Sequence, residues 1–206
     1  MSTNSAPRSS PLALTILFML IGGPLHPYEM QRRMKHWGKD RVVNLGQRAN
    51  LYKTIDRLAR AGLIAVRNTE KDKRFPERTV YELTDEGLRV GRQWLEEMLS
   101  VPRNEFPQFP AALSFIFGLT PDESLAALEK RALVLRESAN QLEGELRFDA
   151  GSKPPAVTLL DSEYLRAITV AEASWLEAVI EQLRTGVLSW SGEELRQAAK
   201  SFLPGG

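Results

Sequence analysis

The chain has 206 residues, of which 43% are hydrophobic, enough for one large or two small globular cores. It has no cysteine and only two histidines, which excludes a disulfide framework and thiol chemistry and argues against a histidine-rich metal site. The net charge of +1 hides an asymmetry: residues 1–100 carry a net +6, residues 101–206 a net −5, and residues 32–78 alone a net +9. This separation favours a polyanionic partner for the first half, and an unevenly charged solvated surface is the alternative.

The first elements of the chain are a tail and two helices. We expect a disordered Ser- and Pro-rich tail over residues 1–11 and a nearly all-apolar helix over residues 12–21. That apolar run is about half the length needed to span a bilayer, and it lacks the flanking features of a secretory signal. We therefore expect a cytoplasmic protein without a membrane partner. A second helix is predicted over residues 27–37, with Pro27 in its first turn and His26 in a local hydrogen-bonding role.

The third predicted helix, residues 47–61, is amphipathic and is closed by Gly62. At 100° per residue its apolar positions face a core, and its outer face carries Ala49, Asn50, Lys53, Asp56, Arg57 and Arg60. Two strands over residues 64–68 and 79–83 form a hairpin, and a fourth helix follows over residues 84–100. A helix followed at once by a basic hairpin is typical of a winged helix-turn-helix.

Such a unit offers one helix to the major groove of DNA and a loop to the flanking backbone. On the third helix we predict contacts to base edges from Asn50, Lys53 and Arg57. The other predicted contacts are to the DNA backbone or, for the hairpin tip, to the minor groove, and they come from Tyr28, Arg48, Tyr52, Lys71, Lys73 and Arg74. The alternative for all of them is a set of solvated side chains that only confer solubility.

Three prolines mark residues 101–110 as the linker to a second predicted domain, residues 111–206. A helix starts at Thr120 with a capping-box sequence and continues to about residue 147, with apolar residues at heptad spacing. A further helix over about residues 159–187 carries two overlapping apolar stripes. Two stripes can face two neighbours, one in the same chain and one in a partner subunit.

This double stripe predicts a homodimer, and a monomeric helical bundle is the alternative. The candidate dimer contacts are Leu165, Ile168, Trp175, Val179 and Leu183. A short last helix over residues 193–202 is also expected. Trp37 and Trp94 are candidates for an effector pocket, although tryptophans in helical proteins more often anchor a core or an interface.

The segments Gly23–Met30, Ala49–Ile64 and Arg78–Gly87 follow, in order and spacing, three sequence blocks of a known family. These blocks are G-P-x-H-G-Y-E, G-S-[IL]-Y-x-x-L-x-x-L-x-x-x-G-L-[IV] and R-x-x-Y-x-L-T-x-x-G. Residues 12–99 thereby resemble the PadR family of bacterial transcription regulators. The resemblance implies a winged helix with Tyr52 and Lys53 at the DNA, a helical dimerisation region after the linker, and a small-molecule effector of unspecified class. Pro27 replaces the usual glycine and Ala49-Asn50 replaces Gly-Ser, so no operator sequence is carried over.

Together these observations predict a mainly α protein with a small β-hairpin wing. Its N-terminal winged helix-turn-helix, residues 12–100, precedes a C-terminal antiparallel helical dimerisation domain. The predicted function is an effector-responsive repressor that binds an inverted repeat of double-stranded DNA as a homodimer, without cofactor or metal. A protein-interaction module without DNA binding is the alternative. An enzyme is disfavoured because the sequence has no glycine-rich phosphate loop, metal-ligand spacing or nucleophile motif.

Overall fold

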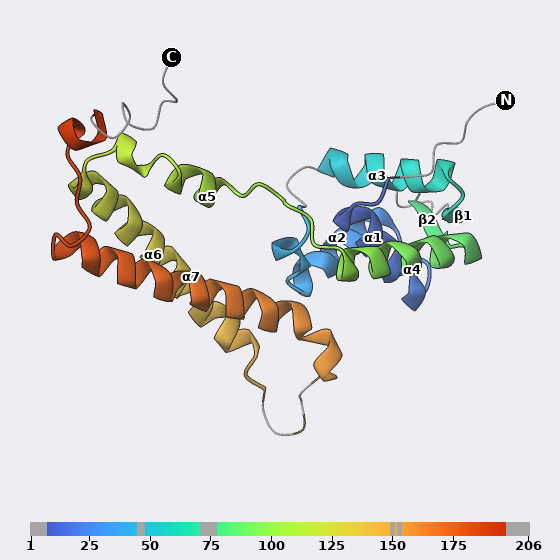
Figure 1. Cartoon of the computed structure of the whole chain (residues 1–206). Helices are drawn as coiled ribbons and strands as arrows, with labels where there is room; N and C mark the ends of the chain where they lie inside the picture. Colours follow the sequence, from blue (N-terminus) through green and yellow to red (C-terminus); the bar gives the residue numbers. More distant parts are fainter. Residues whose placement is uncertain (1–7, 45–47, 71–77, 149–150, 152–153, 197–206) are drawn as a thin grey trace, which may run out of the picture. The chain divides into compact units, whose positions relative to one another are not determined.

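The computed structural model describes residues 8–44, 48–70, 78–148, 151 and 154–196. The chain divides into two compact units, residues 1–104 (unit 1) and residues 105–206 (unit 2), and each is described by itself (Figure 1). Within the described ranges, no helix is both long enough and apolar enough to cross a membrane.

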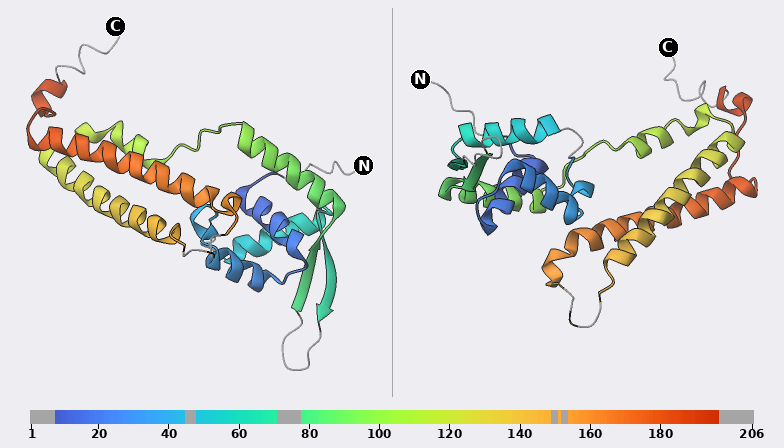
Figure 2. Two further views of the ribbon diagram at one scale, coloured as in Figure 1. Left: turned by 90° about the horizontal axis from the view of Figure 1, so that it is seen from below. Right: turned by 180° about the vertical axis from the view of Figure 1, so that it is seen from behind.

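Unit 1 consists of helices and a two-stranded antiparallel hairpin that projects beyond them (Figure 2). Its elements are α1 (Pro11–Met19), the 3-10 turn η1 (Leu20–Gly22), α2 (Pro27–His36), η2 (Lys39–Arg41), α3 (Arg48–Arg60), β1 (Ile64–Glu70), β2 (Arg78–Leu83) and α4 (Asp85–Ser100). The predicted hairpin and the four predicted helices of this region are therefore confirmed, with ends that differ by at most two residues.

Side-chain caps fix where the helices of unit 1 begin. Ser10 accepts a hydrogen bond from the backbone N–H of Ala13 at the start of α1, and Thr84 accepts one from Gly87 at the start of α4. His26 caps α2 through its Nδ1, which accepts from the N–H of Tyr28 at 3.1 Å. The local hydrogen-bonding role predicted for His26 is thereby confirmed.

The core of unit 1 joins one face of each helix to the start of β1. From α3 it takes Leu51, Ile55 and Leu58, the face that the helical spacing predicted to be buried. The other buried members are Leu12, Ala13, Ile16, Leu17, Leu20, Leu25, Met30, Met34, Val43, Leu63, Ile64 and Trp94. Because this core fixes the rotation of α3 about its own axis, the polar face of α3 must point outward.

The hairpin is anchored at its base and carries an irregularity in the middle. Ile64 pairs with Leu83, and the register shifts between Val66 and Asn68. Leu25 forms an isolated β-bridge with the free edge of β2. Its backbone exchanges hydrogen bonds of 2.9 and 3.0 Å with Tyr81. The base of the wing is thus tied to the segment between α1 and α2.

Unit 2 is built on two long antiparallel helices that lie side by side (Figure 1). Its elements are α5 (Gln108–Leu113), η3 (Ile116–Gly118), α6 (Pro121–Glu145), η4 (Ala156–Thr158) and α7 (Leu160–Arg184). The predicted capping box at Thr120 is confirmed, since Thr120 and Glu123 exchange both hydrogen bonds. Leu128 and Ala132 of α6 pack against Leu176, Ile180 and Leu183 of α7.

Three features differ from the sequence predictions. The predicted tail reaches into ordered structure, because Ser10 caps α1 and Pro11 begins it. Helix α5 begins inside the predicted linker, where Pro110 occupies the first helical turn and so costs no intrahelical hydrogen bond. Of the expected last helix, residues 192–196 are helical and the remainder lies outside the described residues.

Candidate nucleic-acid interface

Helix α3 presents a polar outer face that the core leaves uncovered. Ala49, Asn50, Lys53 and Tyr52 near its N-terminal end are exposed, with Tyr52 47% accessible. This end enters first when a recognition helix is inserted into the major groove. The backbone of Arg48 begins α3, but the side chain of Arg48 lies outside the described part of the structure. Three of the predicted contact residues, Asn50, Tyr52 and Lys53, therefore lie where a duplex can reach the helix.

Arg57 differs from its prediction because it is not fully exposed. Its side chain is half-buried, and its Nη2 lies 3.5 Å from the Oγ of Ser10, a long contact to the residue that caps α1. Its Nε is buried and has no hydrogen-bond partner within the described residues. The helical spacing placed Arg57 on the outer face, whereas the structure turns it toward the segment that precedes α1.

Helix α2 contributes one exposed aromatic side chain and one closed ionic cluster. Tyr28 is 61% exposed in the first turn of α2. Glu29 bonds Arg32 and Arg33, each at 2.9 Å, and hydrogen bonds from Arg33 and then Arg32 lower the pKa of the Glu29 carboxyl. Tyr28 is thus free for a backbone contact, while the charges of the two arginines are already partly neutralised.

The tip of the wing lies outside the described residues, and with it Lys71, Lys73 and Arg74. On the described strands, Arg67 pairs with Glu82 across the hairpin at 3.7 Å. Tyr81 is half-buried against the core of unit 1; burial raises the pKa of its hydroxyl, and the charge of Asp56 raises it further. This side chain, which the sequence did not single out, connects the wing electrostatically to the outer face of α3.

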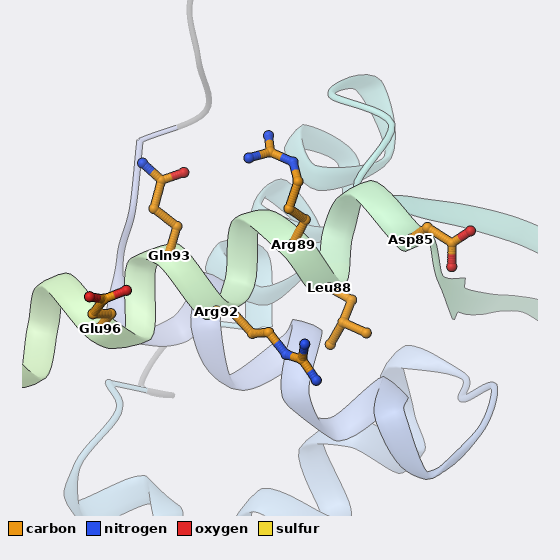
Figure 3. Close-up of a pocket in the computed structure, with 6 residues that line it drawn as sticks. All are labelled: Asp85, Leu88, Arg89, Arg92, Gln93 and Glu96. Atoms are coloured by element: carbon orange, nitrogen blue, oxygen red, sulfur yellow. The ribbon is translucent and has the colours of Figure 1, made fainter.

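One face of α4 forms an open hollow of about 450 Å³. Its lining comes from α4 alone: Asp85, Leu88, Arg89, Arg92, Gln93 and Glu96. In Figure 3, Arg89 and Gln93 point to one side of the helix and Leu88 and Arg92 to the other. A hollow lined by one helix does not enclose a ligand, so it is a surface feature and not a site for a small effector.

The five candidate dimer residues of α7 separate into two groups. Ile168 and Trp175 are 45% and 47% exposed, and Leu165 is half-buried. Leu183 is buried against α6, and Val179 packs on the same core. Leu183 is therefore covered by α6 of the same chain and unavailable as a subunit contact, whereas Val179 is only partly buried and its place at a subunit contact stays a prediction.

The two candidate effector tryptophans also lie in different environments. Trp37 follows α2 and is 51% exposed, whereas Trp94 of α4 is 7% exposed inside the core of unit 1. The burial of Trp94 favours its role as a core anchor. Over the described ranges, no group of His, Cys, Asp and Glu could hold a metal ion.

Comparison with known proteins gives a sequence match within unit 1 and structural matches that extend across both units. Residues 16–93 match the model of the "transcriptional regulator PadR-like family". No curated protein matches the chain. The chain is similar in structure to Bacillus subtilis PadR crystallised in complex with operator DNA, with a TM-score of 0.68, 22% identity, and coverage of 84% of this chain and 99% of that one.

Two further solved structures show the same fold. Bacillus subtilis PadR in complex with p-coumaric acid gives a TM-score of 0.67 at 20% identity and covers 84% of this chain and 98% of its own. The PadR-like transcriptional regulator BC1756 from Bacillus cereus gives 0.61 at 15% identity and covers 85% of this chain and 99% of its own. The similarity extends across both units, which the family model alone does not reach.

Proposed function

We propose that the chain is a DNA-binding transcriptional regulator of the PadR-like family, and that it acts as an effector-responsive repressor that binds an inverted repeat as a homodimer. The match of residues 16–93 to the family model supports this proposal. In this proposal α3 enters the major groove, and Asn50 and Lys53 contact base edges there. Arg48, Tyr28 and Tyr52 contact phosphates, as do Lys71, Lys73 and Arg74 at the wing tip.

The observation that carries the proposal is the orientation of α3 about its own axis. Its apolar residues are locked into the core of unit 1, so Asn50 and Lys53 are exposed at the end that approaches the duplex first. Arg57 is proposed in a changed role: its half-buried guanidinium beside Ser10 suits a phosphate at the edge of the groove better than a base edge at its floor. The fold shared with a PadR crystallised on operator DNA supports this arrangement.

The proposed effector is a small molecule, by similarity to the Bacillus subtilis protein crystallised with p-coumaric acid. That acid is the first probe to test for release of a bound duplex. Of the two candidate tryptophans, the exposed Trp37 keeps a proposed ligand role.

Substitution of Lys53 tests the proposal directly. A duplex selected from a random pool by the purified full chain serves as the probe. Lys53→Ala is expected to weaken binding to that duplex about tenfold or more, because one base or phosphate contact is lost, while the thermal midpoint stays unchanged. Lys130→Ala, which removes the same charge from an exposed position of α6, is the matched control and should bind like the wild type.

The outcomes separate the proposal from its alternative. Unchanged affinity of a folded Lys53→Ala variant would remove α3 as the element that contacts bases. If the wild-type chain binds no duplex even at low salt, where phosphate contacts are strongest, the DNA-binding proposal falls and a protein-interaction module remains.

A further inference from the structure

The outer face of α3 carries one carboxylate, Asp56, among basic residues. Lys53 lies one turn before it and Arg60 one turn after it, and all three side chains are exposed. Arg60 directs its Nε to the backbone oxygen of Asp56 at 3.3 Å. Within the described residues the Asp56 carboxylate forms no ion pair, although two cations are close along the helix.

Several acidic side chains of unit 1 form ion pairs with arginine, whereas Asp56, like Asp85 and Glu96, forms none within the described residues. Ion pairs with arginine at 2.6 to 3.7 Å hold the carboxylates of Glu29, Glu82 and Glu86. A carboxylate without such a partner has acceptor oxygens available to whatever approaches the helix. On a helix that meets a polyanion, that charge opposes binding unless a donor on the duplex pairs with it.

Tyr81 supplies an independent sign of where that charge acts. Burial is the main cause of the raised pKa of Tyr81, and the charge of Asp56 is the next. Tyr81 lies on β2, at the base of the wing, so the field of Asp56 reaches the space between α3 and the hairpin.

We infer that Asp56 is a specificity-determining residue that accepts a hydrogen bond from the N4 amino group of a cytosine in the major groove. In that groove adenine and cytosine both present an amino donor, but only the donor of cytosine has no N7 acceptor beside it, and aspartate and glutamate are the side chains that accept from it. On a duplex with cytosine at that position the carboxylate is paired. On a duplex with guanine or thymine at that position it faces acceptors or a methyl group, and at adenine the amino donor stands beside the N7 acceptor, which repels the carboxylate, so binding is weakened.

This inference rests on the proposed function and adds a role that rejects wrong sequences. Lys53 and Asn50 strengthen binding to DNA. Asp56 instead weakens binding to every duplex that lacks the matching base. Removal of Asp56 is therefore expected to do two things at once: to strengthen binding to unrelated DNA and to erase one base preference.

The experiment is a selection from a random duplex pool with four purified full-length proteins. They are the wild type, Asp56→Ala, Asp56→Asn and the control Glu96→Ala, which removes one negative charge from an exposed position of α4. Alanine is a good helix former, so Asp56→Ala should fold. We expect the wild type and Glu96→Ala to enrich the same sequence, with a fixed cytosine in each half-site. Asp56→Ala should lose only that cytosine, and Asp56→Asn should lose it in favour of adenine, which asparagine can bind.

Binding constants then give the size of the effect. When the cytosine pair is replaced in the selected duplex, wild-type affinity should fall about tenfold and that of Asp56→Ala less than twofold. If Asp56→Ala keeps the cytosine preference, or gains affinity for every duplex by the same factor as Glu96→Ala, the inference is overturned and the proposed function stands. If the wild type enriches no sequence, both are overturned.

Discussion

Gly87 shows how one residue fixes the position of helix α3. A Cβ at this position would lie 1.9 Å from the carbonyl oxygen of Leu63, in the turn that follows α3. Beside it, the hydroxyl of Thr84 donates to the carbonyl oxygens of Gly62 and Leu63 at 2.8 and 3.0 Å. The start of α4 is therefore pressed against the end of α3, and only a glycine allows the contact.

Gly87→Ala is expected to destabilise unit 1 by about 1–3 kcal/mol, because the backbone must move to admit the methyl group. The control is Gly91→Ala, one turn later, where the nearest atoms are side-chain carbons of Phe18 at 3.3 Å and Leu17 at 3.4 Å. These side chains can shift, and alanine favours the helix, so Gly91→Ala should be close to neutral. Urea unfolding of the full chain measures both, and equal midpoints for the two variants would contradict the steric explanation.

The sequence predicted which residues of α3 are buried, but not the surroundings of Arg57. Helical spacing identifies a face from residues within one element. It contains no information on Ser10, which lies 47 positions earlier and meets Arg57 only after α1 has packed on α3. Trp94 shows the same limit, since its place in the core depends on helices that converge from distant parts of the chain.

At the scale of elements, the α6–α7 pair was predictable in outline. Apolar residues at heptad spacing indicated antiparallel packing, and the core of unit 2 uses Leu128, Ala132 and Leu142 from that pattern. Helix α5 was not predictable, because prolines near a helix start and prolines in a linker give the same sequence signal. The ion pairs between α6 and α7 were also not predictable, because they depend on how the two helices are aligned along their lengths.

These flanking ion pairs differ in how well they are shielded. Arg131 bonds Glu172 at 2.5 Å with both side chains about one-third exposed, and its guanidinium lies 3.7 Å from the ring centroid of Phe109. Arg136 bonds Glu177 at 2.8 Å, but both side chains are more than half exposed. The first pair therefore combines charge, packing and a cation–π contact, whereas the second is a solvated surface pair.

Arg131→Ala is accordingly expected to lower the stability of unit 2 by about 1–2 kcal/mol, and Arg136→Ala by less than about 0.5 kcal/mol. Thermal unfolding at two salt concentrations is the measurement, with the Arg136 variant as the control. A Phe109→Leu background should remove part of the Arg131 effect and leave the Arg136 effect unchanged. Similar losses for the two arginine variants would show that the stacking on α5 contributes nothing.

At the scale of the whole molecule, charge follows the division into units. The basic half of the sequence forms unit 1 and the acidic half forms unit 2. In the proposed complex an acidic unit 2 would be repelled by phosphate, so it would not compete with α3 for the duplex. Unit 2 carries an exposed apolar stripe on α7, in which Tyr164 is 65%, Ile168 45% and Trp175 47% exposed.

The proposed homodimer uses this stripe, and the two faces of α7 provide its test. Ile168→Glu is expected to convert a particle of twice the 23.1 kDa chain mass into a single chain in sedimentation, because a charge is placed in an apolar contact, while helical circular dichroism is retained. Leu183→Glu instead places a charge in the α6–α7 core and should unfold unit 2. Val66→Glu, at a 55% exposed position of the wing strand, is the control and should leave the mass unchanged.

The Ile168 variant should also bind a duplex carrying the full inverted repeat no better than one carrying a single half-site, since two linked recognition helices gain affinity that one cannot. A wild-type chain that sediments as a monomer at micromolar concentration, or a folded Ile168→Glu variant that keeps the dimer mass, would rule out this surface as the subunit contact.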